Sequence, residues 1–361
     1  MNVLQLISNK VWGGGERYAL DLSRALAADG HSVGVITRRC AAVDEPFAAA
    51  GFVPGHLPLG GVLDFYSPLQ LARVLNRIDG PVVVHCHNFK TARTAVWARR
   101  LSRRAGSVKI VVTRHLARPA ATSASAAELY GAIDALIFVS DYARRTFIST
   151  SPTVDAEKVH VVPNALASPP PLTEKSSGAP VEILYLGRID PEKGLDVLID
   201  ALAKLPPDLP EWHLTVAGTG TARDVMPLLR FGRQAGIDSR IDWKGFVSDP
   251  SALLASAHIG VLPTRAPEAF GLALLEYMDS GCVPVTSDSG AQPEIVTDGV
   301  DGAVFAAGDA AALADALTPL IADSALRHRL GLAAAQTARS RFDYTDFYKN
   351  ITKIYRATIA P

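Results

Sequence analysis

The sequence predicts an α/β protein of two domains, each built on an open parallel sheet that helices cover. Three observations support this fold class. The chain has 361 residues, which favours two domains over one. Short β-rich runs alternate with amphipathic stretches in both halves of the chain. Residues 168–180, SPPPLTEKSSGAP, separate the halves as a Pro-, Ser- and Gly-rich segment typical of a linker.

The first half begins with the run MNVLQLISNK, which lacks the basic and long apolar segments of a signal peptide. We therefore expect a first strand there. The following segment, ERYALDLSRALAADG, has apolar residues at helical spacing, and Gly30 suits the C′ position that ends the helix. Later strands are predicted at SVGVIT, VVVHC, KIVVT and ALIFVS. This alternation implies a parallel sheet with helices on both faces.

The second half repeats the pattern with VEILYLG, HLTVAG, RIDWKG, IGVLP, VPVTS and GAVF. We predict a first domain over 1–167, a linker over 168–180 and a second domain over 181–340. An Ala-rich helical stretch covers 310–340. A final helix, roughly Tyr344–Thr358, carries aromatic residues, and we expect residues 341–361 to pack back toward the first domain.

Charge and cysteine content narrow the classes of function. Residues 1–167 carry 19 Lys and Arg against 12 Asp and Glu, whereas residues 168–361 carry 17 against 24. This asymmetry suggests that the first half meets an anion, such as a phospholipid headgroup or a phosphorylated acceptor. No known nucleic-acid module is present, so a nucleic-acid partner is not expected. Three scattered cysteines and no bilayer-spanning stretch favour a reducing, cytoplasmic location.

The most informative segment is PEAFGLALLEYMDSGCVPV, residues 267–285. A helix starting near Phe270 would expose the amides of Phe270, Gly271 and Leu272, which makes an anion site suited to phosphate. Glu276 lies further along this helix, where a carboxylate can accept hydrogen bonds from the vicinal hydroxyls of a ribose. Glu268 precedes the helix. An arbitrary pair of glutamates at this spacing is usually structural, but the surrounding EAFGLALLE favours a site.

A second segment, YLGRIDPEKGLDVLIDAL over 185–202, places two cations in the turn after a strand. Arg188 and Lys193 can neutralise a diphosphate there. A lysine near a helix start opposes the helix dipole, which favours a ligand over a merely solvated turn.

Two segments of the first half also follow strands. In WGGGERY, Gly13, Gly14 and Gly15 allow the loop to surround a phosphate or sugar, although the pattern is not a dinucleotide fingerprint. In VVTRHL, His115 comes directly after a strand and is expected at the ligand-binding edge, with a loop histidine as the plainer interpretation. His85 and His87 form His-x-His, but no third metal ligand is evident. The chain has no Asp-x-Asp, and no divalent metal or other cofactor is expected.

Together these motifs resemble family-4 retaining glycosyltransferases of GT-B architecture, in which two Rossmann-like domains face each other across a cleft. The resemblance covers essentially the whole chain. It rests on GGGERYALDLSRALAADGHSV, VVPNAL, YLGRIDPEKGLDVLIDAL, LTVAGTG, KGFVSD and EAFGLALLEYMDSGCVPVTSDSGAQPEIVTDGVDGAVF.

The resemblance implies a role for each matching residue. Glu276 would bind the donor ribose and Glu268 the hydroxyls of the transferred sugar, while Arg188 and Lys193 would hold the diphosphate. The amides of Phe270, Gly271 and Leu272 would contact the phosphate and the sugar, and Gly14 and Gly15 would contact the diphosphate. His115 would lie near the reacting face of the sugar. Gly218 and Gly220 would border the nucleotide, and Val247 would flank the base. The first domain would take the acceptor. The sequence departs from the family around His115, where T-R-H-L places Arg114 as an extra charge near the acceptor.

The activity expected from the resemblance is transfer, with retention, from a nucleotide-diphosphate sugar to a glycan or lipid-linked acceptor. The setting would be the synthesis of cell-surface glycan, lipopolysaccharide or glycolipid, with UDP favoured over GDP. Two alternatives stay open: a GT-B sugar-nucleotide epimerase and a catalytically silent nucleotide-sugar-binding subunit.

Residues 90–106, KTARTAVWARRLSRRAG, have the pattern of a basic amphipathic helix with Val96, Trp97 and Leu101 as its apolar stripe. Such a helix can lie on an anionic membrane, here the inner face of the cell membrane. The alternative, a solvated surface helix with Trp97 in the core, is slightly favoured.

Overall fold

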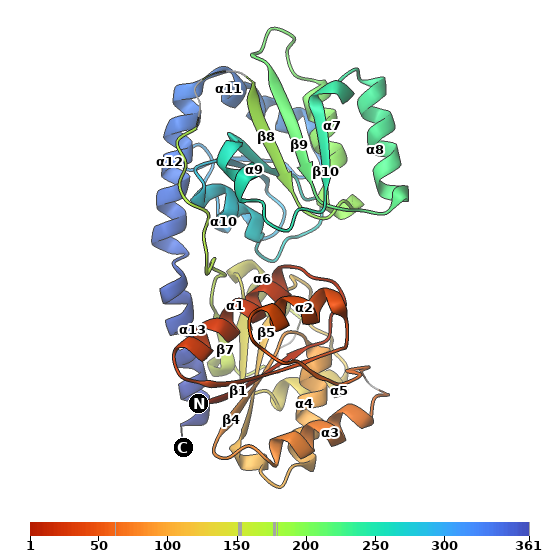
Figure 1. Cartoon of the computed structure of the whole chain (residues 1–361), viewed down its shortest axis with the longest axis vertical. Coiled ribbons are helices and arrows are strands. Elements are labelled where there is room, and N and C mark those ends of the chain that lie inside the picture. Colours follow the sequence, from red (N-terminus) through yellow and green to blue (C-terminus); the bar gives the residue numbers. More distant parts are fainter. Residues whose placement is uncertain (62, 151–153, 176–177, 179, 361) are drawn as a thin grey trace. The chain divides into compact units, whose positions relative to one another are not determined.

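The computed structural model describes residues 1–61, 63–150, 154–175, 178 and 180–360. The chain divides into two compact units. The first comprises Met1–Asn164 together with Thr345–Pro361, and the second comprises Ala165–Tyr344. Figure 1 shows the helices and strands that make up each unit.

The first unit contains a seven-stranded sheet in the order β3-β2-β1-β4-β5-β6-β7, and the pairs along it are parallel. Its strands are β1 (Asn2–Ile7), β2 (Ser32–Thr37), β3 (Gly55–His56), β4 (Val82–Cys86), β5 (Val108–Arg114), β6 (Ala135–Phe138) and β7 (Val159–Val161). The central strands are mostly apolar and almost wholly buried, as expected for strands covered on both faces.

Seven α-helices of the described chain belong to this unit: α1 (Gly14–Ala28), α2 (Ala41–Ala49), α3 (Tyr66–Leu75), α4 (Phe89–Leu101), α5 (Ala124–Gly131), α6 (Asp141–Ile148) and α13 (Tyr344–Ile359). Helices α1 and α13 lie on one face of the sheet, and α3 and α4 pack together on the other (Figure 1). Helix α1 ends as expected, because Asp29 is its C-cap and Gly30 follows with φ of +75°.

Helix α13 returns the end of the chain to the first unit. Phe347 packs edge-on against Tyr18 of α1, with ring centroids 5.2 Å apart. The hydroxyl of Tyr355 lies 2.6 Å from Nδ1 of His85 on β4, and that of Tyr348 donates to Asp29 at 2.8 Å. The aromatic residues of the last helix therefore pack against the first unit.

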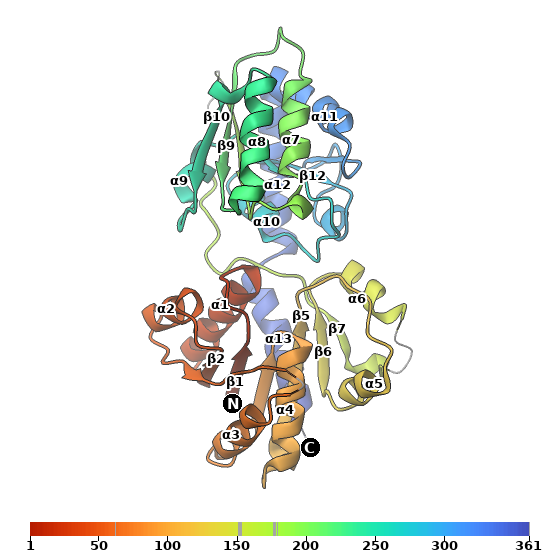
Figure 2. The same ribbon diagram turned by 90° about the vertical axis from the view of Figure 1, so that its right-hand side faces the viewer.

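The second unit contains a six-stranded parallel sheet in the order β10-β9-β8-β11-β12-β13. Its strands are β8 (Val181–Leu186), β9 (Trp212–Ala217), β10 (Ile241–Gly245), β11 (Ile259–Leu262), β12 (Val283–Ser287) and β13 (Ala303–Phe305). Its helices are α7 (Leu195–Ala203), α8 (Ala222–Gln234), α9 (Ser251–Ser256), α10 (Leu272–Asp279), α11 (Ala310–Ala322) and α12 (Ser324–Arg341). Helix α7 packs against α8 and α11, and α10 against α12 (Figure 2).

The predicted fold class, two Rossmann-like domains, is confirmed. Some details differ. The stretch 310–340 forms two helices, because Asp323 ends α11 and caps α12 by accepting from the amides of Ala325 and Leu326. The described part of 168–180 lies with the second unit, where Lys175 Nζ donates to the carbonyl of Leu254 at 2.6 Å. The basic helix predicted over 90–106 ends at Leu101 as α4.

Candidate active site

Each sheet has a switch point at its centre, where the chain reverses the direction in which strands are added. In the second unit this point lies between β8 and β11, and in the first between β1 and β4. Ligands of doubly wound sheets bind beyond the carboxyl ends of the strands at such a point. A ligand of the second unit is therefore expected at the loops that follow β8 and β11.

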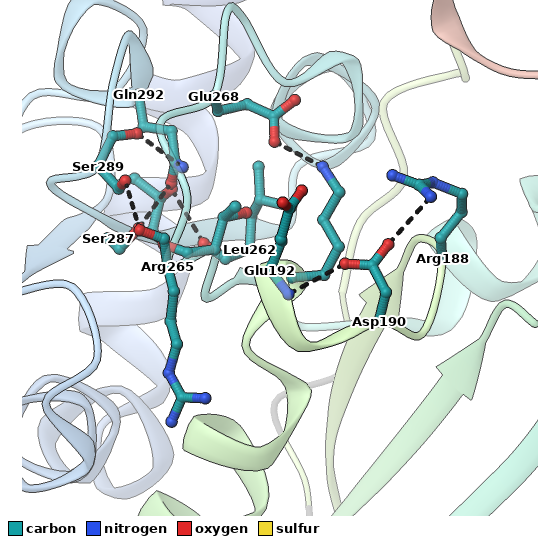
Figure 3. A network of polar contacts seen from close by, with 12 residues as sticks. Arg188, Asp190, Glu192, Leu262, Arg265, Glu268, Ser287, Ser289 and Gln292 are labelled. Carbon is teal, nitrogen blue, oxygen red and sulfur yellow. Dashed lines mark hydrogen bonds and ion pairs between the residues drawn. The ribbon is translucent and has the colours of Figure 1, made fainter. Parts of the chain in front are cut away.

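The loops after β8 and β11 meet through an ion pair. Lys193 Nζ lies 2.6 Å from Glu268 Oε2, and both side chains are partly buried, with 20% and 22% of their surface exposed. Figure 3 shows Glu268 pointing to this ammonium group. The structure thus brings together two residues that are 75 positions apart in the sequence and that sequence motifs predicted separately.

Local backbone geometry places Lys193 beside β11. Asp190 caps the short turn Pro191–Lys193 by accepting from the amide of Glu192. Gly194 then takes a left-handed φ of +69°, and a Cβ there would lie 2.0 Å from the carbonyl oxygen of Pro263. Only glycine permits this crossing, which holds the turn of Lys193 directly on the end of β11.

Glu268 is held by backbone contacts on both sides of its loop. The amide of Arg265 donates to the carbonyl of Glu192 at 2.9 Å, which joins the loop to the turn of Lys193. The amide of Ala291 donates to the carbonyl of Glu268 at 2.9 Å, and Glu268 pairs with Gly290 in a parallel bridge. The carboxylate therefore projects from a loop that is fixed to its neighbours on either side.

Arg188 is the more exposed cation of the pair predicted to hold a diphosphate. Its guanidinium lies 3.1 Å from Asp190 Oδ2, and 65% of its side chain is exposed (Figure 3). Because the guanidinium of Arg188 is largely in solvent, it can leave Asp190 for a ligand at small cost.

The N-terminus of α10 is open for an anion. Gly271 is its N-cap with φ of +97°, and no side chain caps the helix. In the part of the chain that the structure describes, the amides of Phe270, Gly271 and Leu272 bond to no acceptor. Glu276 lies one turn into this helix and is partly buried. The start of the helix therefore offers free N–H groups and the positive end of its dipole beside Glu268.

Gly218 and Gly220 have a packing role that accounts for their identity. A Cβ at Gly218 would lie 1.7 Å from the carbonyl oxygen of Gly187, and one at Gly220 would lie 2.2 Å from that of Ile189. They allow the loop after β9 to run against the loop that carries Arg188. Val247 follows β10 and is partly buried, beside Phe246, which is 71% exposed.

In the first unit, the glycine loop after β1 is organised by a buried carboxylate. Glu16, 4% exposed, accepts from Nδ2 of Asn9 at 2.6 Å. Burial raises the pKa of this carboxyl, while hydrogen bonds from Asn9 and from the amides of Glu16 and Gly13 lower it. Gly14 and Gly15 form the first turn of α1. Glu16 therefore ties the first turn of α1, with Gly14 and Gly15, to Asn9 in the loop after β1.

His115 lies beside the start of α1. A Cβ at Gly15 would lie 3.5 Å from Cδ2 of His115, an ordinary van der Waals distance, so the imidazole lies directly beside Gly15. His115 also packs edge-on against Tyr18, with ring centroids 4.8 Å apart. The structure thus brings together Gly15 and His115, which the sequence placed in different motifs.

A chain of hydrogen bonds links His115 to Gln5. Nε2 of His87 lies 2.9 Å from Oε1 of Gln5, and Nδ1 of His87 lies 3.2 Å from Nε2 of His115. With the Gln5 amide so oriented, its oxygen only accepts, so His87 donates through Nε2 and accepts at Nδ1. His115 then donates through Nε2 and keeps a lone pair on Nδ1.

A second chain lies beneath the first. Thr113 Oγ1 is 2.8 Å from Nε2 of His85 and 3.2 Å from the hydroxyl of Tyr18, and Nδ1 of His85 meets Tyr355 of α13. The imidazoles of this region are neutral near pH 7. Burial lowers the pKa of His115 to about 4 and, with a smaller contribution from His115, that of His85 to about 3. Burial also holds the pKa of His87 well below its usual range.

Known protein families match both halves of the chain. The family model described as Glycosyl transferases group 1 matches residues 173–337, and that described as Glycosyltransferase Family 4 matches residues 12–167. The chain is 30% identical over 366 residues to a phosphatidyl-myo-inositol mannosyltransferase of Mycobacterium leprae, with 95% of this chain and 92% of that protein covered. The chain belongs to the family-4 glycosyltransferases of GT-B architecture.

Other similar proteins agree with this assignment. A lipopolysaccharide core biosynthesis mannosyltransferase, LpcC of Rhizobium leguminosarum, is 35% identical over 218 residues, covering 58% of this glycosyltransferase and 60% of LpcC. The crystal structure of HepE from Anabaena in complex with UDP has the same fold, with a TM-score of 0.83, 20% identity and coverage of 99% of this chain and 100% of that one.

Several residues that build the site of this glycosyltransferase were missed by sequence reasoning. Gln5, Asn9 and Glu16 escaped notice because a single polar residue carries no motif of its own. Their signal would have been a buried position within an otherwise apolar run, as for Gln5 in VLQLI. The tight turn at Gly194 was also missed.

That Arg114 adds a charge near the acceptor stays a prediction. Its guanidinium lies over the ring of Phe89, 4.9 Å from the centroid, and burial lowers its pKa. Arg114 therefore packs on aromatic rings of the first unit as a cation–π partner.

The basic surface helix of the glycosyltransferase predicted over 90–106 is confirmed only in part, as α4. Val96 is buried in the core, whereas Trp97 and Leu101 are each 49% exposed, so the alternative with Trp97 in the core is wrong. Arg99 pairs with Asp134 at 2.6 Å and Arg100 with Glu128 at 2.8 Å. These acids neutralise part of the positive charge. None of the helices in the described ranges is long and apolar enough to cross a bilayer.

Proposed function

We propose that this glycosyltransferase transfers a sugar with retention of configuration from a nucleotide-diphosphate donor to an acceptor hydroxyl. UDP is favoured over GDP as the nucleotide. The acceptor is a glycan or a lipid-linked intermediate of cell-surface glycan, lipopolysaccharide or glycolipid synthesis. The reaction needs no divalent metal, and the enzyme works in the cytoplasm, with α4 as a candidate contact to the inner face of the cell membrane.

The observation that carries this proposal is the Lys193–Glu268 pair at the switch point of the second sheet, next to the uncapped start of α10. A diphosphate placed there can take hydrogen bonds from Lys193 and from the amides of Gly271 and Leu272. Lys193 exchanges its contact with Glu268 for one with phosphate. The freed carboxylate can then accept hydrogen bonds from hydroxyls of the sugar.

The proposed transfer moves one bond on one face of the sugar. The bond between the anomeric carbon and the phosphate oxygen breaks, and the bond to the acceptor oxygen forms on the same side. The acceptor proton passes to the departing phosphate oxygen. Arg188, Lys193 and the α10 amides stabilise the negative charge that grows on the diphosphate, a role that otherwise falls to a metal ion.

His115 suits a position near the reacting sugar because it is neutral. A protonated imidazole would repel the positive charge that develops on the sugar ring. The lone pair left on Nδ1 of His115 can accept a hydrogen bond from a sugar hydroxyl. The glycine loop at Gly14 and Gly15 is proposed to approach the diphosphate, with Glu276 at the ribose, Gly218 and Gly220 beside the nucleotide, and Val247 at the base.

The names and titles of similar proteins support the proposed donor and acceptor classes. Structures of HepE contain UDP or UDP-glucose. The relatives in Mycobacterium leprae and Rhizobium leguminosarum are named as mannosyltransferases acting on phosphatidyl-myo-inositol and in lipopolysaccharide core synthesis. Among the described residues, no group of three or more His, Cys, Asp or Glu side chains is arranged to hold a metal ion.

The test uses the whole protein and a panel of UDP- and GDP-sugars. Thermal shift first identifies the donor that binds, because a ligand of the folded state raises apparent stability. Slow hydrolysis of that α-linked donor is then followed by proton NMR in the presence of EDTA. We expect free α-sugar as the first product. A β-sugar would refute retention, an epimerised nucleotide-sugar would indicate an epimerase, and binding without turnover of donor or acceptor would indicate a silent subunit.

A further inference from the structure

Three cations gather at the carboxyl edge of the sheet in the first unit. Lys10 follows β1, Arg38 follows β2, and Lys90 lies in the first turn of α4 after β4. These strands are neighbours in the order β2-β1-β4. The cations therefore lie at and beside the switch point of this sheet, where a ligand of the first unit is expected.

Backbone and side-chain contacts bring the three segments together. The amide of Arg38 donates to the carbonyl of Ile7 at 3.0 Å, and Cys40 Sγ approaches the carbonyl of Lys10 at 3.1 Å. Lys90 extends past Gly61, where a Cβ would lie 3.5 Å from its Cε.

The charges of this cluster interact. The pKa of Lys90 is lowered by burial and then by the charge of Arg38, while Asp64 raises it and Lys10 lowers it again. Asp64 keeps its negative charge, and its carboxylate accepts from the amides of Gly60 and Ser67. Burial and the like charges of Arg38 and Lys10 together outweigh Asp64, so the pKa of Lys90 is lowered.

Among the residues that the structure describes, other cations of this unit form ion pairs with acidic side chains, which Lys10, Arg38 and Lys90 do not. Arg99, Arg100 and Arg104 each pair with an acidic side chain, respectively Asp134, Glu128 and Asp79. Within the described residues, Lys10, Arg38 and Lys90 form no ion pair with an acid. Like charges gathered at a ligand-binding edge without acidic partners are relieved by a bound anion.

We propose that Lys10, Arg38 and Lys90 bind a phosphate group carried by the acceptor. The inference rests on the proposed function and narrows its acceptor to phosphorylated molecules. An arginine fork and two ammonium groups match the three outer oxygens of a phosphate monoester or the two of a diester. The diphosphate of the donor has a separate set of partners in the second unit, namely Arg188, Lys193 and the start of α10.

The experiment measures binding of glycerol 3-phosphate by calorimetry to the whole protein, with glycerol as the uncharged probe. We expect the wild type to bind glycerol 3-phosphate and not glycerol. The double variant Arg38→Gln, Lys90→Gln should bind it about a hundredfold more weakly, roughly tenfold for each lost cation. The matched control, Arg100→Gln with Arg104→Gln, removes two cations of the same unit and should leave this binding unchanged.

Two further arms separate the outcomes. UDP binding is measured on the wild type and on each variant. If the wild type does not bind UDP, the proposed function is refuted, whereas the proposal for the phosphate site is judged by glycerol 3-phosphate binding alone. Vesicles of phosphatidylinositol in phosphatidylcholine, against phosphatidylcholine alone, distinguish a lipid headgroup from a soluble sugar phosphate as the source. Equal binding of glycerol 3-phosphate by the double variant and the wild type overturns the proposal, as does equal weakening in the control. Unchanged thermal unfolding of the variants ensures that only folded protein is compared.

Discussion

The carboxyl edges of the two sheets share a topology but differ in electrostatics. In the second unit the switch point is lined by charged groups, and the pair between Lys193 and Glu268 is accessible to solvent in part. In the first unit the corresponding point is lined by neutral imidazoles, with His85 and His87 buried and linked by hydrogen bonds. The same strand order thus supports two different kinds of polar surface.

This difference matches the two demands of the proposed reaction. A departing diphosphate accumulates negative charge, which cations and helix amides stabilise. The reacting sugar develops positive charge, which a neutral imidazole tolerates. In the first unit the cations Lys10, Arg38 and Lys90 follow β1, β2 and β4 at the same edge of the sheet, where they suit the phosphate proposed for the acceptor.

The largest effect on activity should come from the charged residues at the carboxyl edge of the second sheet. Replacing Lys193 with Ala removes a cation from the developing charge of the leaving group, and we expect turnover of the donor to fall by about 10²–10³-fold. Donor hydrolysis by the purified variant measures this directly. Combined loss of Lys193 and Arg188 with near wild-type turnover would falsify the assignment of both residues.

A smaller effect is expected from the chain that orients His115. In Gln5→Met the acceptor for His87 is lost, so neither the tautomer nor the angle of His115 is fixed any longer. We expect kcat/KM to fall by about 10–100-fold, with UDP affinity retained because the second unit is untouched. Thr113→Val is the matched control, since it disturbs the buried hydroxyl between His85 and Tyr18 but leaves Gln5, His87 and His115 in place. If both variants lose activity equally, the chain has no specific role.

The neutral histidines at the carboxyl edge of the first sheet should also make stability depend on pH. The folded pKa values of His115 and His85, about 4 and about 3, lie below the value of about 6.5 for an unfolded histidine. Between these limits the unfolded state binds more protons, so the free energy of unfolding falls as the pH drops from about 6.5 toward about 4. Thermal unfolding across this range measures the slope.

A matched pair of variants tests that explanation of the slope. We expect a shallower slope in His115→Gln and an unchanged slope in His328→Gln, because His328 is exposed on α12. Equal slopes in the wild type and His115→Gln would show that His115 does not contribute.

The sequence predicted the charged residues at the edge of the second sheet better than the neutral histidines at the edge of the first. Arg188, Lys193, Glu268 and the start of α10 each lie in a continuous segment whose strand, turn and helix could be recognised locally. The chain of Gln5, His87 and His115 draws one residue from each of three segments in or after β1, β4 and β5, and only the sheet register brings them together. Such contacts have no local periodicity, so they could not be predicted from the sequence.

Surface detail was also hard to predict from pattern alone. The segment 90–106 has one helical periodicity, but the chain leaves the helix after Leu101 because Ser102 adopts an extended conformation. Which arginines keep a free charge depends on acids from other elements, such as Asp134 and Glu128. The balance of +7 over residues 1–167 therefore overstated the charge that helix α4 can offer to a membrane.

The smallest effect should come from an ion pair that resembles Lys193–Glu268 only in its N–O distance. Arg265 and Asp196 approach to 2.6 Å, as Lys193 and Glu268 do, but they are 43% and 41% exposed, and solvent screens their attraction. We expect Arg265→Gln to change stability by about 1 kcal/mol or less and turnover by about twofold or less. The measurement is thermal unfolding and donor hydrolysis beside Lys193→Ala. A loss in Arg265→Gln comparable to that in Lys193→Ala would mean that Arg265 also contacts the donor, and that exposure is a poor guide to which charges of this edge take part in the reaction.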